Sequence, residues 1–348
     1  MRVAVVGAGV MGAATAWQLK TRGVDVTLFE QFGPGHVRGS SHGGSRIFRF
    51  AYDDVEYVGM AKRALMLWRE LEAEAGETVL DITGGVDHGP ASEIERLSAS
   101  MAAAGADHDV LSTEEAEARF GGMRFDERVL VHPDGGRCRA DAAVAAMQRL
   151  AGTTYDTRIT SIDDLDADVV VVAAGAWVTK LLPDVGLPDL KVTCEQVVHF
   201  PSRVDMSWPS FIHRQANGVG IYGLETPGEG VKVAEHHIGA EVDPDTRGFD
   251  LDDAYVARMV AYVEQWFPGL DPTPVFPTTC LYTNTPNEDF LLDRVGDVVI
   301  VSPCSGHGFK FAPEIGRLAA DLVMGEPPEH ERFTLAAHER WQGTVRHL

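Results

Sequence analysis

Apolar and polar positions at the start of the chain follow the pattern of a βαβ unit. Residues 2–6 form a short apolar run typical of a buried strand, and residues 13–22 have the apolar spacing of a helix. A glycine-rich turn separates these two segments, and a second apolar run, residues 24–29, predicts another strand. Strand, turn, helix and strand in this order indicate an α/β fold with parallel strands.

Helical and strand patterns alternate along the rest of the chain. Further helices are expected at residues 54–76, 140–150 and 251–267, with a last one starting near Gly308. Residues 168–175 are a continuous apolar run, as in a parallel strand buried on both faces. Residues 192–239 alternate in strand fashion between Gly, Pro and Asn breaks, which predicts an antiparallel sheet. Strands are expected again at 280–285 and 298–302.

We therefore expect two domains, both assembled from separated pieces of chain. A Rossmann-like dinucleotide-binding domain should comprise residues 1–80, 137–190 and 276–348. A second, α+β domain that carries the antiparallel sheet should comprise residues 81–136 and 191–275.

Composition and charge exclude several classes of function. The net charge of −22 opposes binding to phosphate backbones, so no nucleic-acid partner is expected. No stretch reaches the roughly 18 apolar residues of a membrane span, and glycines break the N-terminal apolar run, unlike in a signal peptide. The cysteines are widely spread, without a CxxC pair, which argues against a disulfide framework and favours a cytoplasmic protein.

The turn between the first strand and helix reads Gly7-Ala8-Gly9-Val10-Met11-Gly12. In a dinucleotide-binding unit the three glycines make the tight turn, admit the pyrophosphate and pack the helix on the strand, respectively. Glu30 closes the second strand and should accept hydrogen bonds from the adenosine ribose hydroxyls. This motif alone does not distinguish NAD from FAD.

Three further segments resemble the monomeric sarcosine oxidase and N-methyltryptophan oxidase family. Residues 39–52, GSSHGGSRIFRFAY, resemble the family's flavin loop. Residues 279–283, TCLYT, resemble its covalent flavin segment, and residues 305–311, SGHGFKF, its C-terminal active-site motif. The chain departs from the family between Leu150 and Asp168, where it is shorter by a hairpin, and at residues 223–227, which leaves the substrate open.

The resemblance implies FAD as the cofactor. Cys280 would attach it covalently, as an 8α-S-cysteinyl thioether, whereas Cys304 is expected to be a packing residue. Arg46 would lie near the ring face or the N5 edge of the flavin. The other residues expected to contact FAD are Gly7, Gly9, Met11, Gly12, Glu30, Ser40, Ser41, Ser45, Ile159, Gly175, Gly306, Gly308, Phe309 and Lys310.

The resemblance also implies roles in catalysis. Arg49 and Lys310 would clamp the substrate carboxylate, the arginine with a bidentate fork and the lysine as a point charge. Lys232 would stabilise the superoxide that forms when oxygen accepts an electron. Tyr282 and His307 would line the substrate cavity, together with the family's active-site histidine at His236.

No metal site is expected. His236 and His237 are adjacent, and neighbouring residues of a strand point to opposite faces of the sheet. No third ligand stands at a suitable spacing.

The function implied is oxidation of a small secondary amino acid, such as sarcosine or another N-methyl amino acid, to an imine, with oxygen reduced to hydrogen peroxide. Three alternatives remain: a cyclic imino acid such as pipecolate or proline as substrate, a nicotinamide (NAD(P))-dependent oxidoreductase, and a non-catalytic FAD-binding protein. A monomer is expected.

Overall fold

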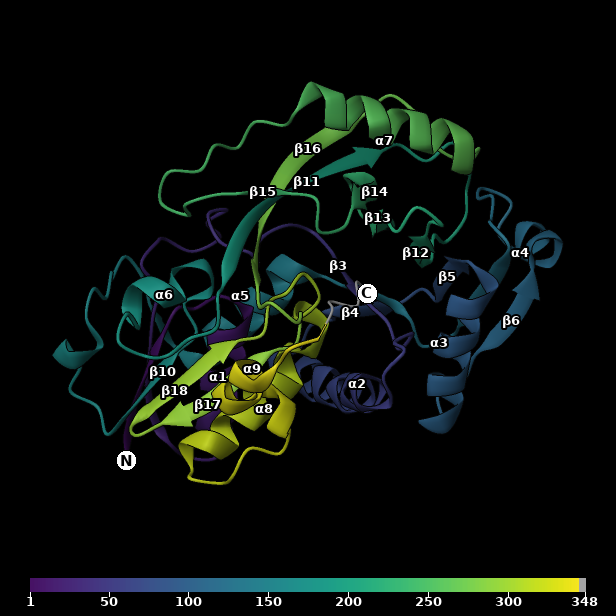
Figure 1. Ribbon diagram of the computed structural model, residues 1–348. Coiled ribbons are helices and arrows are strands. Elements are labelled where there is room, and N and C mark those ends of the chain that lie inside the picture. Colours follow the sequence, from purple (N-terminus) through teal and green to yellow (C-terminus); the bar gives the residue numbers. More distant parts are fainter. Residues whose placement is uncertain (344–348) are drawn as a thin grey trace.

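A six-stranded sheet forms the base of the molecule (Figure 1). The structure, a computed structural model, describes residues 1–343, so the end of the expected 276–348 piece lies outside the described residues. The strand order is β17 (Leu291–Val295), β18 (Val298–Ser302), β10 (Val169–Val172), β1 (Arg2–Val6), β2 (Asp25–Phe29) and β9 (Thr153–Thr154). All pairs are parallel except β17 with β18.

The centre of this sheet is formed by the apolar runs identified in the sequence. All four valines of β10 are buried, because β1 and β18 flank the strand and side chains cover both faces. One face packs against α1 (Val10–Thr21), α2 (Val55–Ala75), α5 (Ala140–Ala151) and α8 (Ala312–Val323). Helix α1 begins earlier than expected, since Gly9 already serves as its N-cap.

The second large sheet confirms the expected antiparallel region. Its order is β15 (Ala240–Glu241), β11 (Lys191–Phe200), β14 (Gly230–Glu235), β13 (Gly220–Thr226), β12 (Ser210–Arg214), β5 (Gly85–Gly89), β7 (Arg128–His132) and β6 (Asp109–Ser112). Helix α7 (Asp253–Trp266) covers the face turned away from the six-stranded sheet (Figure 1). The apolar side chains between α7 and this sheet form a second hydrophobic core.

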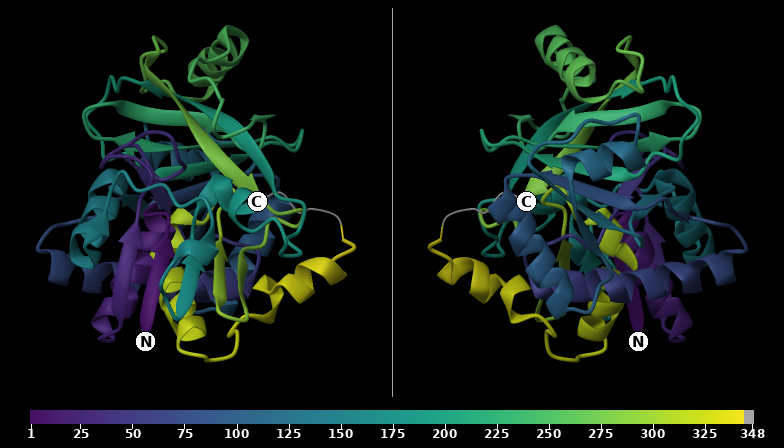
Figure 2. Two further views of the ribbon diagram at one scale, coloured as in Figure 1. Left: turned by 90° about the vertical axis from the view of Figure 1, so that its left-hand side faces the viewer. Right: turned by 90° about the vertical axis from the view of Figure 1, so that its right-hand side faces the viewer.

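Strand β16 (Val275–Asn284) connects the two sheets. It pairs with β11 along its length, with Cys280 opposite Glu195, and Figure 2 shows it reaching from the upper sheet toward the lower one. The expected division assigned residues from 276 onward to the dinucleotide-binding domain. That boundary is wrong for β16, because the strand forms its hydrogen bonds in the second sheet.

The remaining elements are short. A three-stranded sheet joins β3 (Arg46–Phe48), β8 (Gly136–Cys138) and β4 (Leu80–Ile82). The other helices are α3 (Ala91–Ala103), α4 (Thr113–Arg119), α6 (Val178–Leu181) and α9 (Leu335–Arg340), with 3-10 turns η1 (Ile162–Asp164), η2 (Gly175–Trp177), η3 (Phe309–Phe311) and η4 (Glu331–Phe333). The helix expected from Gly308 is therefore η3 followed by α8, and it is not the last, since α9 follows. Within residues 1–343, no helix combines the length and apolarity that crossing a membrane requires.

Replacing Gly12 by alanine should destabilise the protein, because a Cβ there would stand 1.8 Å from the carbonyl oxygen of Gly7. Overpacking of this kind costs roughly 1–3 kcal/mol or more, so the urea midpoint of the variant should fall clearly. Gly186→Ala is the matched control, since nothing lies within 4 Å of its added Cβ. Equal midpoints for the two variants would contradict the packing role of Gly12.

Candidate functional site

A cavity of about 460 Å³ lies between the two large sheets, beside the carboxyl ends of β1 and β10. Ligands of open α/β sheets bind at this edge. Of the residues singled out from the sequence, only Gly12 does not line the cavity. Those that do are Gly7, Gly9, Met11, Glu30, Ser40, Ser41, Ser45, Arg46, Arg49, Ile159, Gly175, Lys232, His236, Cys280, Tyr282, Gly306, His307, Gly308, Phe309 and Lys310.

The glycine turn, residues 7–12, has the geometry that a pyrophosphate requires. Gly7 has a positive φ of 96°, and a Cβ on it would lie 2.6 Å from the carbonyl oxygen of Ala173. Helix α1 starts at this turn with no acidic residue in its first turn, so its positive end is open to an anion. The buried Glu30 carboxylate accepts from the backbone N–H of Ala8 at 3.0 Å and of Phe32 at 3.1 Å. These residues fit a dinucleotide cofactor.

The flavin loop, residues 39–52, is folded around Arg46. Its guanidinium donates to the carbonyl oxygens of Ser45, Ser40 and His42 at 2.8, 2.9 and 2.6 Å. One of its nitrogens lies 3.6 Å from the Cys280 sulfur. Arg46 therefore brings the loop against β16, the strand that carries Cys280.

Cys280 presents a free, buried thiol to the cavity. Its sulfur lies 3.5 Å from the carbonyl oxygen of Ser40 in the flavin loop. The thiol therefore faces the cavity from β16, beside the flavin loop.

Lys232 lies on β14 with its side chain in the cavity wall, 5% exposed. Its ammonium donates to the carbonyl oxygen of Ser45 at 2.9 Å. Burial, and next the charge of Arg46, lower the pKa of Lys232 to about 7. The lysine can therefore change charge near neutral pH.

Arg49 and Lys310 lie beside the same aromatic ring. The Arg49 guanidinium carbon is 4.1 Å from the centroid of Tyr52, and the Lys310 nitrogen is 5.6 Å from it. Each cation donates to a backbone carbonyl, Arg49 to Ala51 and Lys310 to His307. Burial, and then the nearby charge of Arg49, hold the pKa of Lys310 well below its usual value. In the part of the chain described, neither has a carboxylate within hydrogen-bonding distance, so both are available to an anion.

Aromatic side chains form another wall of the cavity. The Tyr282 hydroxyl lies 3.4 Å from the His236 Nδ1 and 3.4 Å from the Tyr222 hydroxyl. His307 stacks on Phe290 and contacts the Glu288 carbonyl oxygen through Nε2 at 3.1 Å. Burial lowers the pKa values of His236 and His307 well below the usual range, so both rings are neutral.

Sequence reasoning missed Tyr222 and His199, which also line the cavity. Tyr222 lies on β13, where it shares a face with Lys232 of the neighbouring strand β14. Tyr222 lies two residues before Leu224, which is paired with Lys232, so all three side chains are on one face of the sheet. The sequence shows the two-residue spacing, but it does not show that Leu224 and Lys232 are paired. His199 is directly opposite Lys232 on β11, and the sequence contains no signal of that pairing.

One argument made from the sequence is wrong. Strand β14 ends at Glu235, so His236 and His237 do not point to opposite faces, and their ring centroids are only 4.0 Å apart. Gly308, which is expected to contact FAD and lines the cavity, stands in a tight turn. A Cβ there would lie 1.6 Å from the carbonyl oxygen of Pro303, so the turn itself requires glycine.

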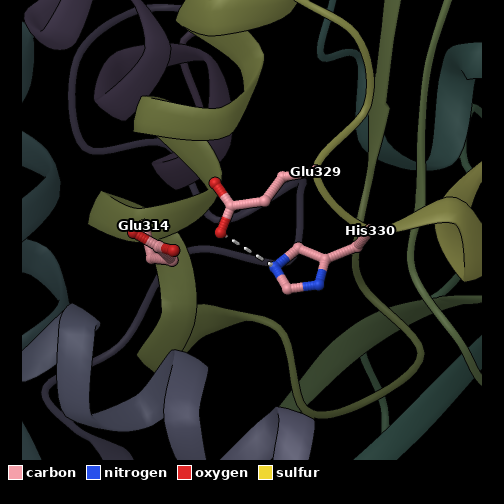
Figure 3. Close-up of side chains that lie close together, drawn as sticks. All are labelled: Glu314, Glu329 and His330. Carbon is pink, nitrogen blue, oxygen red and sulfur yellow. Dashed lines mark ion pairs between the residues drawn. The ribbon is translucent and has the colours of Figure 1, made fainter.

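A different cluster has ligand atoms close enough together to hold a cation. Glu314, Glu329 and His330 approach one another on α8 and the segment that follows it (Figure 3), with ligand atoms within 4.8 Å. Both carboxylates are already paired, since Glu314 accepts from Arg63 at 2.6 Å and Arg317 at 2.8 Å, and Glu329 accepts from Arg317 at 2.8 Å. We interpret the cluster as an ion-pair network that holds the segment after α8, which contains Glu329 and His330, against this helix.

Comparisons with known proteins agree with this geometry. Residues 2–322 match the model of a family described as FAD dependent oxidoreductase. The chain is 33% identical to peroxisomal sarcosine oxidase from Mus musculus over 94% of this chain and 93% of that one, and 33% identical to monomeric sarcosine oxidase from Bacillus sp. (strain B-0618) over the same shares. The solved structure of NikD, described as an unusual amino acid oxidase essential for nikkomycin biosynthesis, superposes with a TM-score of 0.82 at 25% identity over 95% of both chains.

The family match covers most of the chain and the sarcosine oxidases cover nearly all of it, so the resemblance inferred from the three segments is confirmed. The match to an FAD-dependent family also excludes the nicotinamide-dependent alternative. The chain belongs to the FAD-dependent oxidoreductase family and, within it, is a flavoprotein amine oxidase of the sarcosine oxidase type.

Proposed function

We propose that the protein oxidises a small secondary amino acid, such as sarcosine, to an imine, with oxygen reduced to hydrogen peroxide. The observation that supports this most strongly is the pair of buried basic side chains, Arg49 and Lys310, beside Tyr52. They share one cavity with the glycine turn and the thiol of Cys280.

Each group has a distinct part in the proposed reaction. Arg49 and Lys310 bind the substrate carboxylate, and the neutral aromatic wall of Tyr222, Tyr282 and His236 surrounds the amine end. FAD, when bound, would accept two electrons from the C–H bond next to the amine nitrogen and pass them to oxygen. Lys232 supplies a positive charge where oxygen is reduced.

A cyclic imino acid remains the second candidate substrate. NikD is described as an unusual amino acid oxidase, and the carboxylate clamp would serve a cyclic secondary amine as well as an N-methyl amino acid. Peroxide release across a panel of N-methyl and cyclic amino acids separates the two, because only the compounds that the protein oxidises release peroxide.

We also propose that the FAD is covalent, bound to Cys280 through its 8α carbon, and that the protein is a monomer. The names of the bacterial relatives, monomeric sarcosine oxidases, support the second point. The cytoplasm stays the expected compartment, although the mouse relative is named peroxisomal.

Covalent attachment predicts that acid-denatured protein stays yellow and that a peptide containing Cys280 carries the mass of FAD. Cys280→Ser should release its flavin on acid precipitation. Cys304→Ser, which removes the other cysteine that lines the cavity, should retain it. Flavin that leaves the wild-type protein in acid would refute the attachment.

Lys232→Met should slow reoxidation by oxygen by about 10²-fold while leaving anaerobic reduction by substrate largely intact. Because the pKa of Lys232 is about 7, its ammonium is present below that pH and lost as the pH rises through it. Wild-type reoxidation should therefore slow above pH 7, and the variant should lack this dependence. Stopped-flow absorbance measures both half-reactions. Lys191→Met, at an exposed position on β11, is the control. If Lys232→Met slowed reduction and reoxidation by the same factor, Lys232 would have a structural role instead.

Arg49→Ala should raise the dissociation constant of every carboxylate substrate about 10- to 100-fold, since a charged hydrogen bond contributes roughly 1.5–3 kcal/mol. Arg49→Lys should recover part of this loss, because lysine lacks the fork geometry. The flavin spectrum should stay close to native. Wild type should discriminate strongly against an amine without a carboxylate, and Arg49→Ala should not. If Arg49→Ala weakened binding of the carboxylate substrate and of the uncharged amine to the same extent, Arg49 would support the fold instead.

A further inference from the structure

Asp87 is a buried carboxylate directly behind the proposed clamp. It lies on β5, is 1% exposed and does not line the cavity. Its Oδ1 is 3.9 Å from the Arg49 Nη1 and accepts from the Arg214 Nη2 at 3.4 Å. Its Oδ2 is 4.0 Å from the Nε2 of His132, on the neighbouring strand β7.

Within residues 1–343, the cations that face Asp87 are Arg49 and Arg214. His132 is fully buried, and burial, followed by the charge of Arg49, lowers its pKa to about 3, so the ring is neutral. Burial raises the pKa of Asp87, and the charges of Arg49 and Arg214 oppose that rise. A buried carboxylate thus stands between two guanidinium groups, only one of which lines the cavity.

The Arg49–Asp87 separation is too long for a hydrogen bond. At 3.9 Å, Asp87 attracts Arg49 only through its charge, and Arg49 donates no hydrogen bond to it. Arg214, by contrast, donates a hydrogen bond to Asp87 and so neutralises part of the negative charge of Asp87.

We propose that Asp87 weakens the carboxylate clamp, because Asp87 and the substrate carboxylate are both attracted to the positive charge of Arg49. This inference rests on the function proposed above. A bound carboxylate would place Arg49 between two anions, and their mutual repulsion weakens binding. Asp87 acts through Arg49, and Arg214 limits its effect by neutralising part of its charge. The clamp therefore holds a carboxylate less tightly than Arg49 and Lys310 would without Asp87.

The charges at positions 87 and 214 should consequently have opposite effects. Asp87→Asn keeps the shape of the side chain and removes the competing anion, so carboxylate binding should become about 3- to 30-fold tighter. Arg214→Gln leaves the full charge of Asp87 to act on Arg49, so binding should become about 3- to 30-fold weaker. A purely structural role would instead weaken binding in both variants.

The test uses purified holoenzyme and butyrate, a carbon isostere of sarcosine that has no amine to oxidise. Its dissociation constant is measured from the change in flavin absorbance. Anaerobic flavin reduction by N-methylethylamine, which has no carboxylate, should stay within about 2-fold of wild type in both variants, because the effect acts on an anion alone.

Glu314→Gln is the matched control. Glu314 is also fully buried between two arginines, Arg63 and Arg317, but none of these three residues lines the cavity (Figure 3 shows Glu314 on α8). Its loss should lower the melting temperature and leave butyrate binding unchanged. Tightening by Glu314→Gln as well would show a general effect of net charge and overturn the proposal.

Unchanged or weaker butyrate binding in Asp87→Asn would also overturn it. If that variant yields no holoenzyme, Arg214→Gln decides, and unchanged or tighter binding there counts against the proposal. Failure of the clamp itself is a separate result: butyrate would then bind wild type and Arg49→Ala equally.

Discussion

The site is organised by basic side chains of the cavity wall whose donors are satisfied by backbone carbonyls. Arg46 and Lys232 donate to carbonyl oxygens of the flavin loop, Arg49 donates to Ala51, and Lys310 donates to His307. A carbonyl satisfies the donor hydrogen without cancelling the charge. In a chain of net charge −22, this cavity therefore keeps positive charge that an anionic ligand can use.

These same bonds join parts of the fold that are distant in sequence. Lys232, from the second sheet, is bonded to Ser45 of the flavin loop, and Arg247 bonds both to Thr279 on β16 and to the carbonyl oxygens of Val37 and Arg38. The loop is thereby held between the sheet that carries the glycine turn and the strand that carries Cys280. The position of the flavin loop and the shape of the cavity wall therefore depend on the same contacts.

Burial controls which of the charged groups are in fact charged. His236 and His307 are neutral because burial lowers their pKa values, and Lys232 is close to its point of titration at neutral pH. Arginine keeps its charge under the same conditions. A permanent charge at Arg49 suits the binding of a carboxylate, whereas an adjustable one at Lys232 suits a step in which charge develops.

The sequence by itself determined the βαβ unit, the buried strand β10, the antiparallel region and the identity of the site residues that stand in local motifs. Glycine spacing and apolar runs specify local conformation, and the resemblance carried by residues 39–52, 279–283 and 305–311 identified the parts of the cavity wall that lie in these segments. Only the tertiary structure decided that β16 pairs with β11, that His199 faces Lys232, and that Asp87 stands behind Arg49. The reason is that strand register and the burial of a charge depend on contacts between residues far apart in the chain, and no local pattern encodes these contacts.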